Sequence, residues 1–161
     1  MFAEIDLPVP GRPWQPEIRR RALSARSVLL AHPWSISLLE TRSVAQNPAT
    51  LRHHDAVIGT LRRGGFGLAL TARAFAMVDS YVYGFVLQEV TLPATSPQHL
   101  PAEVAALVDT LDAGAHPHLA ELTLEYFLTP DYDFSDEFER GLDLLLGALE
   151  RELAQQRADS P

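Results

Sequence analysis

Residues Phe75 to Gln88 read FAMVDSYVYGFVLQ, a run of helix length that is apolar on almost every side and holds one carboxylate, Asp79, near its middle. With 100° per residue, two opposite faces can be assigned. One face carries Ala72, Phe75, Ala76, Asp79, Tyr83 and Val86, and the other carries Ala74, Met77, Tyr81, Gly84 and Phe85. A helix that is apolar all round lies in a large core, crosses a membrane, or separates its own core from a partner.

A homodimer is the arrangement that this helix favours. A membrane span needs about 20 apolar residues without charge, and Arg73 and Asp79 interrupt the run. A core that covers the helix on every side is difficult to build from so few flanking helices. The face of Ala74, Met77, Tyr81, Gly84 and Phe85 is therefore predicted to meet a second copy of the chain.

The last predicted helix, residues 135–156, has the same two-sided character. One apolar face carries Phe138, Leu142, Leu145 and Leu149, and a second flank of smaller residues carries Leu144, Leu146 and Gly147. Two such helices from each subunit would form a four-helix bundle across the dimer.

The remaining sequence also predicts helices, so the fold class is all-α, and no segment alternates like a strand. The predicted ranges are 16–31, 34–41, 47–63, 68–90, 102–112, 118–128 and 135–156. The helix 47–63 should turn Leu51, His54, Ile58 and Leu61 inward and stop at Gly64-Gly65. Ser135 is the expected N-cap of the last helix. We divide the chain into a remnant of a connecting helix and linker at 1–15 and one domain at 16–157.

Composition narrows the function classes. The net charge is -8, which disfavours contact of this chain with nucleic-acid phosphates. The absence of cysteine excludes disulfides and thiolate chemistry. The N-terminus lacks the features of a signal peptide, so the cytoplasm is the expected location.

Asp79 on the inward face is the first candidate functional residue, because an ionised carboxylate is costly there unless it is paired. One interpretation is that an arginine, a histidine or a tyrosine hydroxyl satisfies it. The other is that it lines a ligand cavity, in which a few polar groups orient a small molecule. Arg21, in the run Arg19-Arg20-Arg21, would serve either purpose if it turned inward, as a partner of Asp79 or of a ligand carboxylate.

Four segments together carry a resemblance to a known family. They are WQPEIRRRALSARSVLLAHPWSISLLETR, LRHHDAVIGTLRRGGF, ARAFAMVDSYVYGFVLQE and FERGLDLLLGALE. In order and spacing they resemble the C-terminal regulatory domain of tetracycline-repressor (TetR) family transcription regulators. The resemblance implies an all-α homodimer with a four-helix bundle and an effector cavity in each subunit.

The same resemblance implies a set of effector-facing positions. They are Arg21, Ala25, Leu38, Arg42, His54, Val57, Phe75, Ala76, Asp79 and, by its place on the same helix face, Tyr83. Gln88 would reach toward the other subunit, beside the interface positions on the two long helices. Leu38 stands where the tetracycline repressor holds its magnesium-bound drug through a histidine, so we expect a small, largely apolar effector and no metal or cofactor.

The DNA-reading helix-turn-helix of the family has no counterpart in this sequence. The chain is therefore expected to be a fragment or late-start version of a longer regulator, or a natural domain without its reader. Operator DNA would be a partner only through that N-terminal domain. An alternative is a stand-alone helical protein that pairs with an intact relative.

Catalytic and metal sites are not predicted. His53 and His54 point about 100° apart on a helix and cannot clamp one ion, and we expect His54 to face the pocket and His53 the solvent. His99, His116 and His118 lie in loops without a carboxylate partner. No motif of nucleophilic or phosphate chemistry is present, and a small enzyme that uses Asp79 with His54 is the least favoured alternative.

Overall fold

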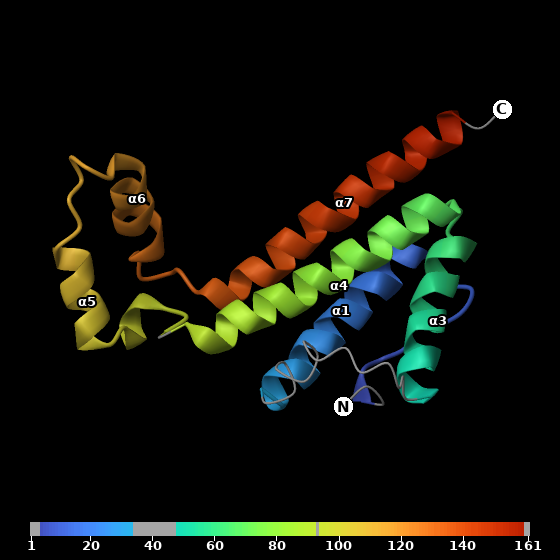
Figure 1. The fold of residues 1–161 in the computed structure, drawn as a ribbon, viewed down its shortest axis with the longest axis horizontal. Coiled ribbons are helices and arrows are strands. Elements are labelled where there is room, and N and C mark those ends of the chain that lie inside the picture. The colour runs from blue at the N-terminus through green and yellow to red at the C-terminus, as the bar shows by residue number, and fades with distance from the viewer. Residues whose placement is uncertain (1–3, 34–47, 93, 160–161) are drawn as a thin grey trace. The chain divides into compact units, whose positions relative to one another are not determined.

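The described chain folds entirely into helices and connecting loops. A computed structural model describes residues 4–33, 48–92 and 94–159, and no strand occurs within these ranges (Figure 1). The chain divides into two compact units. Unit 1 comprises residues 1–87 and 141–161, and unit 2 comprises residues 88–140. The all-α class predicted from the sequence is confirmed.

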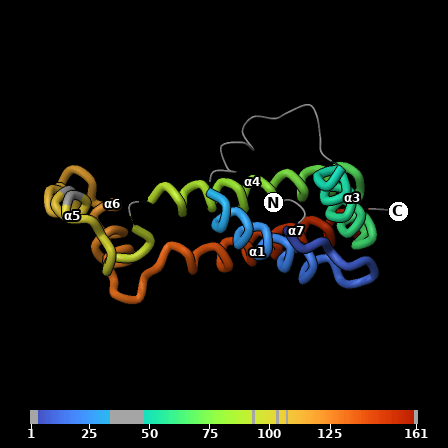
Figure 2. Tube along the Cα trace, turned by 90° about the horizontal axis from the view of Figure 1, so that it is seen from below, coloured from blue at the N-terminus to red at the C-terminus, as the bar shows by residue number. Residues whose placement is uncertain are grey.

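Unit 1 is built from α1 (Trp14–Ala31), α3 (Pro48–Arg63), most of α4 (Leu68–Thr91) and most of α7 (Glu137–Ala158). Both ribbon views show α4 and α7 side by side along their lengths, with α1 beside them (Figures 1 and 2). Arg19 of α1 forms an ion pair with Asp143 of α7 at 2.7 Å, and the amide of Gly67, just before α4, donates to Gln156 of α7 at 2.7 Å. The predicted helix at 34–41 lies outside the described residues.

The turn between α3 and α4 follows the prediction of a stop at Gly64-Gly65. Gly65 has φ +97°, a left-handed conformation that glycine adopts without a Cβ penalty. The Phe66 amide donates to the Leu61 carbonyl at 3.2 Å and the Gly65 amide to the Arg62 carbonyl at 3.0 Å. These two bonds form the Schellman motif that commonly ends a helix.

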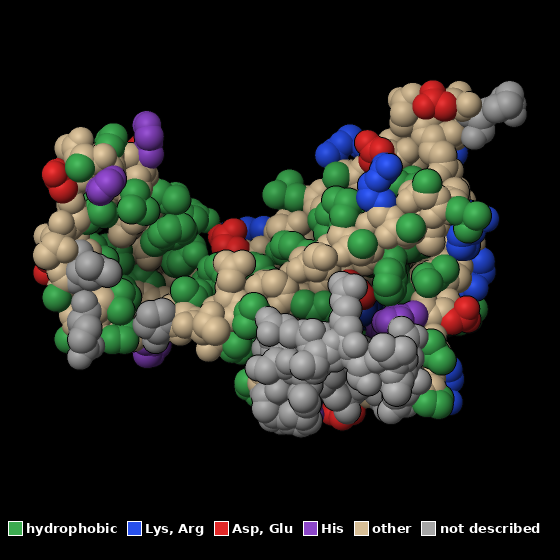
Figure 3. Space-filling view, viewed as in Figure 1, with side chains coloured by type: hydrophobic (Ala, Val, Ile, Leu, Met, Phe, Trp, Pro, Cys, Tyr) green, Lys and Arg blue, Asp and Glu red, His purple; other side chains and the backbone are tan. Residues whose placement is uncertain are grey.

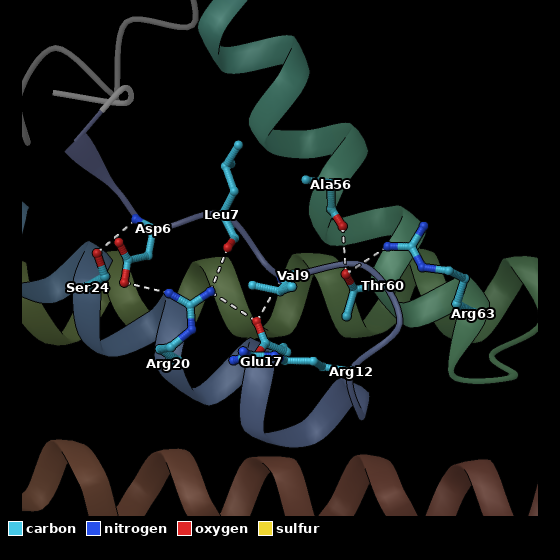
Figure 4. Close-up of polar contacts among 10 residues, drawn as sticks. All are labelled: Asp6, Leu7, Val9, Arg12, Glu17, Arg20, Ser24, Ala56, Thr60 and Arg63. Atoms are coloured by element: carbon cyan, nitrogen blue, oxygen red, sulfur yellow. Dashed lines mark hydrogen bonds and ion pairs between the residues drawn. The ribbon is translucent and has the colours of Figure 1, made fainter.

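The segment before α1 is not helical from residue 5 to residue 13, so this part of the range 1–15 has the character of the predicted linker and not of the predicted helix remnant. Polar contacts tie this segment to α1 (Figure 4). Arg20 pairs with Asp6 at 2.5 Å and donates to the Leu7 carbonyl at 2.6 Å, while the Val9 amide donates to Glu17 at 2.7 Å. The Val9 amide and Arg20 hold the pKa of the Glu17 carboxyl below its ordinary value.

Helix α4 has a buried face that the sequence analysis did not predict. Its buried residues are Leu70, Thr71, Ala74, Val78, Val82, Phe85 and Val86. This stripe runs between the two faces that we had assigned to the ligand and to the partner. Ala74 and Phe85 are therefore corrected: they are buried in the core of their own chain, with 0% and 9% exposure.

Helix α7 packs its long apolar stripe into unit 1. Leu142, Leu146, Leu149 and Leu153 are buried, while Leu144 is 76% exposed. Leu146 thus belongs to the core face and not to the second flank, because spacings of three and four residues align it with Leu142, Leu149 and Leu153. The cap before α7 also differs from the prediction, since the Asp133 side chain accepts from the Ser135 amide at 2.8 Å.

Unit 2 consists of short elements. They are η2 (Pro97–His99), α5 (Ala102–Asp109), α6 (Pro117–Leu122), a π-helical turn η3 (Thr123–Phe127) and η4 (Phe134–Asp136). The Phe134 amide donates to the Thr95 carbonyl at 2.8 Å, and Gln98 donates to the Pro130 carbonyl. These two hydrogen bonds connect residues 95–98 with residues 130–134.

Candidate functional site

A buried charged cluster lies where three helices of unit 1 meet. Arg21 comes from α1, His53 from α3 and Asp79 from α4. The Arg21 Nη1 atom donates to Asp79 Oδ1 at 2.6 Å, and Arg21 Nε donates to His53 Nε2 at 2.9 Å. The Arg21 side chain is 1% exposed and that of Asp79 is 15% exposed. The predicted pairing of Asp79 with an inward-turned Arg21 is confirmed.

The hydrogen bond from Arg21 fixes the state of the His53 ring. Because a guanidinium only donates, Nε2 accepts and the proton of the neutral imidazole resides on Nδ1. Burial, with the charge of Arg21 and the neighbouring His54 adding to it, lowers the pKa of His53 to about 4. His53 is therefore neutral at neutral pH, and Asp79 carries the charge that compensates Arg21.

Aromatic residues lie one helical turn before and one turn after Asp79 on α4, at Phe75 and Tyr83. The ring of His54 packs edge-on against Phe75, with 5.2 Å between centroids, and both side chains are half-buried. Tyr83 lies one turn beyond Asp79 on α4 and is also half-buried. Burial and the charge of Asp79 raise the pKa of the Tyr83 hydroxyl, with Arg21 acting in the opposite direction. Tyr83 is therefore a neutral hydroxyl beside the ion pair.

Arg21 retains hydrogen-bonding capacity. Its Nη2 atom is buried and makes no hydrogen bond that meets the usual geometric limits within the described part of the chain, and the Tyr83 hydroxyl lies near enough to the guanidinium that a hydrogen bond from Arg21 lowers the pKa of Tyr83. A buried donor in this state is uncommon and costs free energy until it meets an acceptor. The cluster thus joins a fixed positive donor to half-buried aromatic faces, an arrangement suited to binding a small molecule that presents an oxygen acceptor.

The structure distributes the predicted effector-facing residues unequally. The cluster and the aromatic residues described with it include five of these positions: Arg21, Asp79, His54, Phe75 and Tyr83. Ala25 and Val57 are fully buried in unit 1, while Ala76 is exposed, so its predicted inward position is wrong. Leu38 and Arg42 lie outside the described residues.

His53 is the member of the buried cluster that the sequence analysis missed. We expected His54 to face inward with Leu51 and Ile58, whereas the buried residues of α3 are His53, Val57, Thr60 and Leu61. Leu51 and Ile58 are 50% and 38% exposed. The spacing of His53, Val57 and Leu61 by four residues was the signal available, and it describes a helix face as regular as the one we chose.

Neither a metal-ligand cluster nor a membrane-spanning helix occurs in residues 4–33, 48–92 and 94–159. Among the described residues no group of at least three His, Asp or Glu side chains is arranged to hold a metal ion. Likewise, none of the helices in these ranges combines the length and apolarity that a bilayer crossing requires.

The buried neutral His53 predicts a pH dependence of stability. Its pKa is about 4 in the folded chain against an ordinary value of 6.5, so the unfolded state binds the extra proton between these values. The stability that follows from keeping His53 neutral is complete above pH 6.5 and is lost as pH falls toward 4. The loss in the free energy of unfolding reaches about 2 kcal/mol at pH 5. Urea unfolding at a series of pH values should show this loss in the parent chain. A His53→Gln variant, which cannot take up the proton, should have a flatter profile, and equal slopes would contradict the assignment.

Comparisons with known proteins agree with this architecture. Residues 7–153 match the family model for the tetracyclin repressor-like C-terminal domain. An HTH-type transcriptional regulator of Saccharopolyspora erythraea is 39% identical over 90 residues, which are 55% of this chain. The matched region spans only 38% of the length of that relative.

Solved structures extend the comparison to nearly the whole chain. A possible TetR family transcriptional regulator from Streptomyces coelicolor A3(2) is 32% identical with a TM-score of 0.69, covering 93% of this chain and 71% of that one. The S. coelicolor protein ActR in complex with actinorhodin has a TM-score of 0.74 at 22% identity, covering 94% and 71%, and shows the shared fold. Since the family model spans most of the sequence, the chain belongs to the family of tetracycline repressor-like C-terminal domains.

Proposed function

We propose that this chain is the effector-binding and dimerisation region of a transcriptional regulator, and that the effector binds at Arg21, His53 and Asp79. The observation that carries the proposal is the buried guanidinium of Arg21, held by two partners and left with a donor in reserve. The effector is a small, largely apolar molecule whose oxygen acceptor meets Arg21 Nη2. Phe75, His54 and Tyr83 supply ring surface for its apolar part.

The proposed dimer uses the outer sides of α4 and α7. Met77 is 40% and Leu144 76% exposed in the single chain. A Cβ added to Gly84 would meet nothing of its own chain within 4 Å, and one added to Gly147 would meet only Arg151. Together with the half-buried Tyr81, these residues of unit 1 provide a surface that a second backbone can approach closely.

In this proposal the chain senses and does not read DNA or catalyse a reaction. An effector that binds one dimer shape better than another shifts the population between the two shapes. Contact with operator DNA belongs to an N-terminal DNA-binding domain of such regulators, because the charge of -8 on these residues repels phosphate.

Effector binding is tested by thermal unfolding of the chain with a library of aromatic metabolites, with actinorhodin included because a neighbouring structure holds it. A ligand at a hundred times its Kd should add about 2.7 kcal/mol to the free energy of unfolding. Asp79→Asn should weaken binding of that ligand, measured by calorimetry, while Asp143→Asn, which alters the exposed pair with Arg19, should not. Equal affinity of the parent and the Asp79→Asn variant would place the effector elsewhere.

A further inference from the structure

A pocket lies entirely within unit 2. Its volume is about 520 Å³, within the range of small-molecule sites. Tyr126, Phe127 and Tyr132 form one wall, and Leu92 and Leu100 contribute aliphatic surface. In the space-filling view hydrophobic side chains gather beside α6, over this part of the unit (Figure 3). The Arg21 cluster belongs to unit 1, so the two sites share no residue.

The aromatic wall is a packed assembly. The centroids of Tyr126 and Tyr132 lie 5.2 Å apart, those of Phe127 and Tyr132 5.2 Å, and those of Tyr126 and Phe127 5.9 Å. Tyr126 and Phe127 come from the π-helical turn η3, and such turns occur frequently at functional sites. Tyr126 is 42% exposed and Phe127 37% exposed. Ring surface is therefore both fixed and open to a ligand.

A carboxylate stands at the edge of this wall. Glu137 lines the pocket, and its Oε1 atom accepts from the Tyr126 hydroxyl at 2.8 Å and from Arg140 at 2.7 Å. This hydrogen bond to Glu137 is the main cause that raises the pKa of Tyr126, so the phenol remains a neutral donor. The pocket lining contains no arginine or histidine. Arg140, whose side chain is 65% exposed, forms an ion pair with this carboxylate.

The charge of the chain is concentrated in this unit. Residues 88–140 contain 11 Asp and Glu and a single Arg, whereas the rest of the chain contains 10 Asp and Glu and 12 Arg. Unit 2 thus carries a net charge of -10, and the remainder +2, with histidine neutral. Such a field attracts cations and repels anions before any contact forms.

We propose that the unit 2 pocket binds a planar aromatic cation, with its ring system against Tyr126, Phe127 and Tyr132 and its positive charge toward Glu137. Aromatic faces attract cations through their quadrupole, and the attraction grows when the cation leaves water. The carboxylate already holds one exposed guanidinium and would hold an organic cation by the same attraction. A neutral aromatic molecule can pack against the three rings but is not attracted by the negative charge of unit 2. An anionic aromatic molecule is repelled by that charge.

The test uses ethidium, a planar aromatic cation, followed by fluorescence anisotropy on the full chain, with fluorescein as an anion of similar size. Ethidium should bind saturably and fluorescein should not. Glu137→Gln keeps an oxygen acceptor for Tyr126 and removes the charge, and it should weaken ethidium binding about tenfold. Glu125→Gln removes the same charge from an exposed residue of η3 outside the lining, and its effect should stay below about twofold.

A second variant tests the ring wall without relying on the carboxylate. Phe127→Leu keeps an apolar side chain and removes the quadrupole, and it should weaken ethidium about fivefold. Equal binding of fluorescein, or ethidium affinity that ignores Glu137→Gln and Phe127→Leu but disappears in Asp79→Asn, would overturn the proposal. Loss of ethidium binding in parallel with self-association of the chain would also overturn it, because a second copy would then occupy the pocket.

Discussion

Replacing Asp79 by alanine is expected to lower the free energy of unfolding by about 3 kcal/mol, because the change leaves the charge of Arg21 buried and uncompensated. The Arg21 side chain is 1% exposed and its shortest contact is the 2.6 Å bond to Asp79. The neutral His53 accepts from the same guanidinium but cannot balance its charge. Urea unfolding monitored by circular dichroism at pH 7 measures the loss.

The matched control for Asp79→Ala is Asp143→Ala. Asp143 pairs with Arg19 at 2.7 Å, also between two helices, but its side chain is 55% exposed. Water screens this pair, so its removal should cost about 0.5 kcal/mol. A double variant, Arg21→Met with Asp79→Ala, removes both charges and should recover part of the stability lost in Asp79→Ala. If Asp79→Ala and Asp143→Ala lose the same amount, the buried pair does not stabilise the fold as we describe.

Part of the Arg21 cluster could be predicted from the sequence, namely the ion pair of Arg21 with Asp79. The apolar surroundings of Asp79 were visible in the sequence, and the cost of a buried charge predicted a partner of the kind that Arg21 provides. The helix ranges were accessible for the same reason, since proline, glycine and the 3.6-residue period act locally. The bond between Arg21 and His53 joins residues 32 positions apart, and nothing local to α3 distinguishes its two candidate faces.

The faces of α4 illustrate the other limit. A helix that is apolar all round offers no polar side from which to orient it, so two opposite faces were assigned where the structure has a buried stripe between them. Ala74 illustrates the consequence, because a small residue fits a close contact within the subunit as well as one between subunits. Burial of Ala74 is decided by the neighbouring helices of unit 1, whose positions the sequence of α4 does not contain.

Two substitutions on helix α7 can test the stability of the fold and the proposed dimer independently. Leu142 is completely buried and Leu144 is 76% exposed, although only one residue separates them. Leu142→Ala should cost about 3 kcal/mol of unfolding free energy, from lost burial and the cavity that remains. Because this loss lies within one subunit, it should not depend on protein concentration in urea unfolding.

Leu144→Glu should have a different outcome. The exposed position tolerates the charge in a single subunit, so the helical circular dichroism spectrum should be unchanged. In the proposed dimer the charge would enter an apolar interface without a partner, and light scattering should therefore give the mass of a monomer. Any difference in unfolding free energy between the parent and Leu144→Glu should then shrink when both are diluted, because the parent also dissociates into monomers. A Leu144→Glu chain with the same mass as the parent would show that this side of α7 faces solvent and not a second copy.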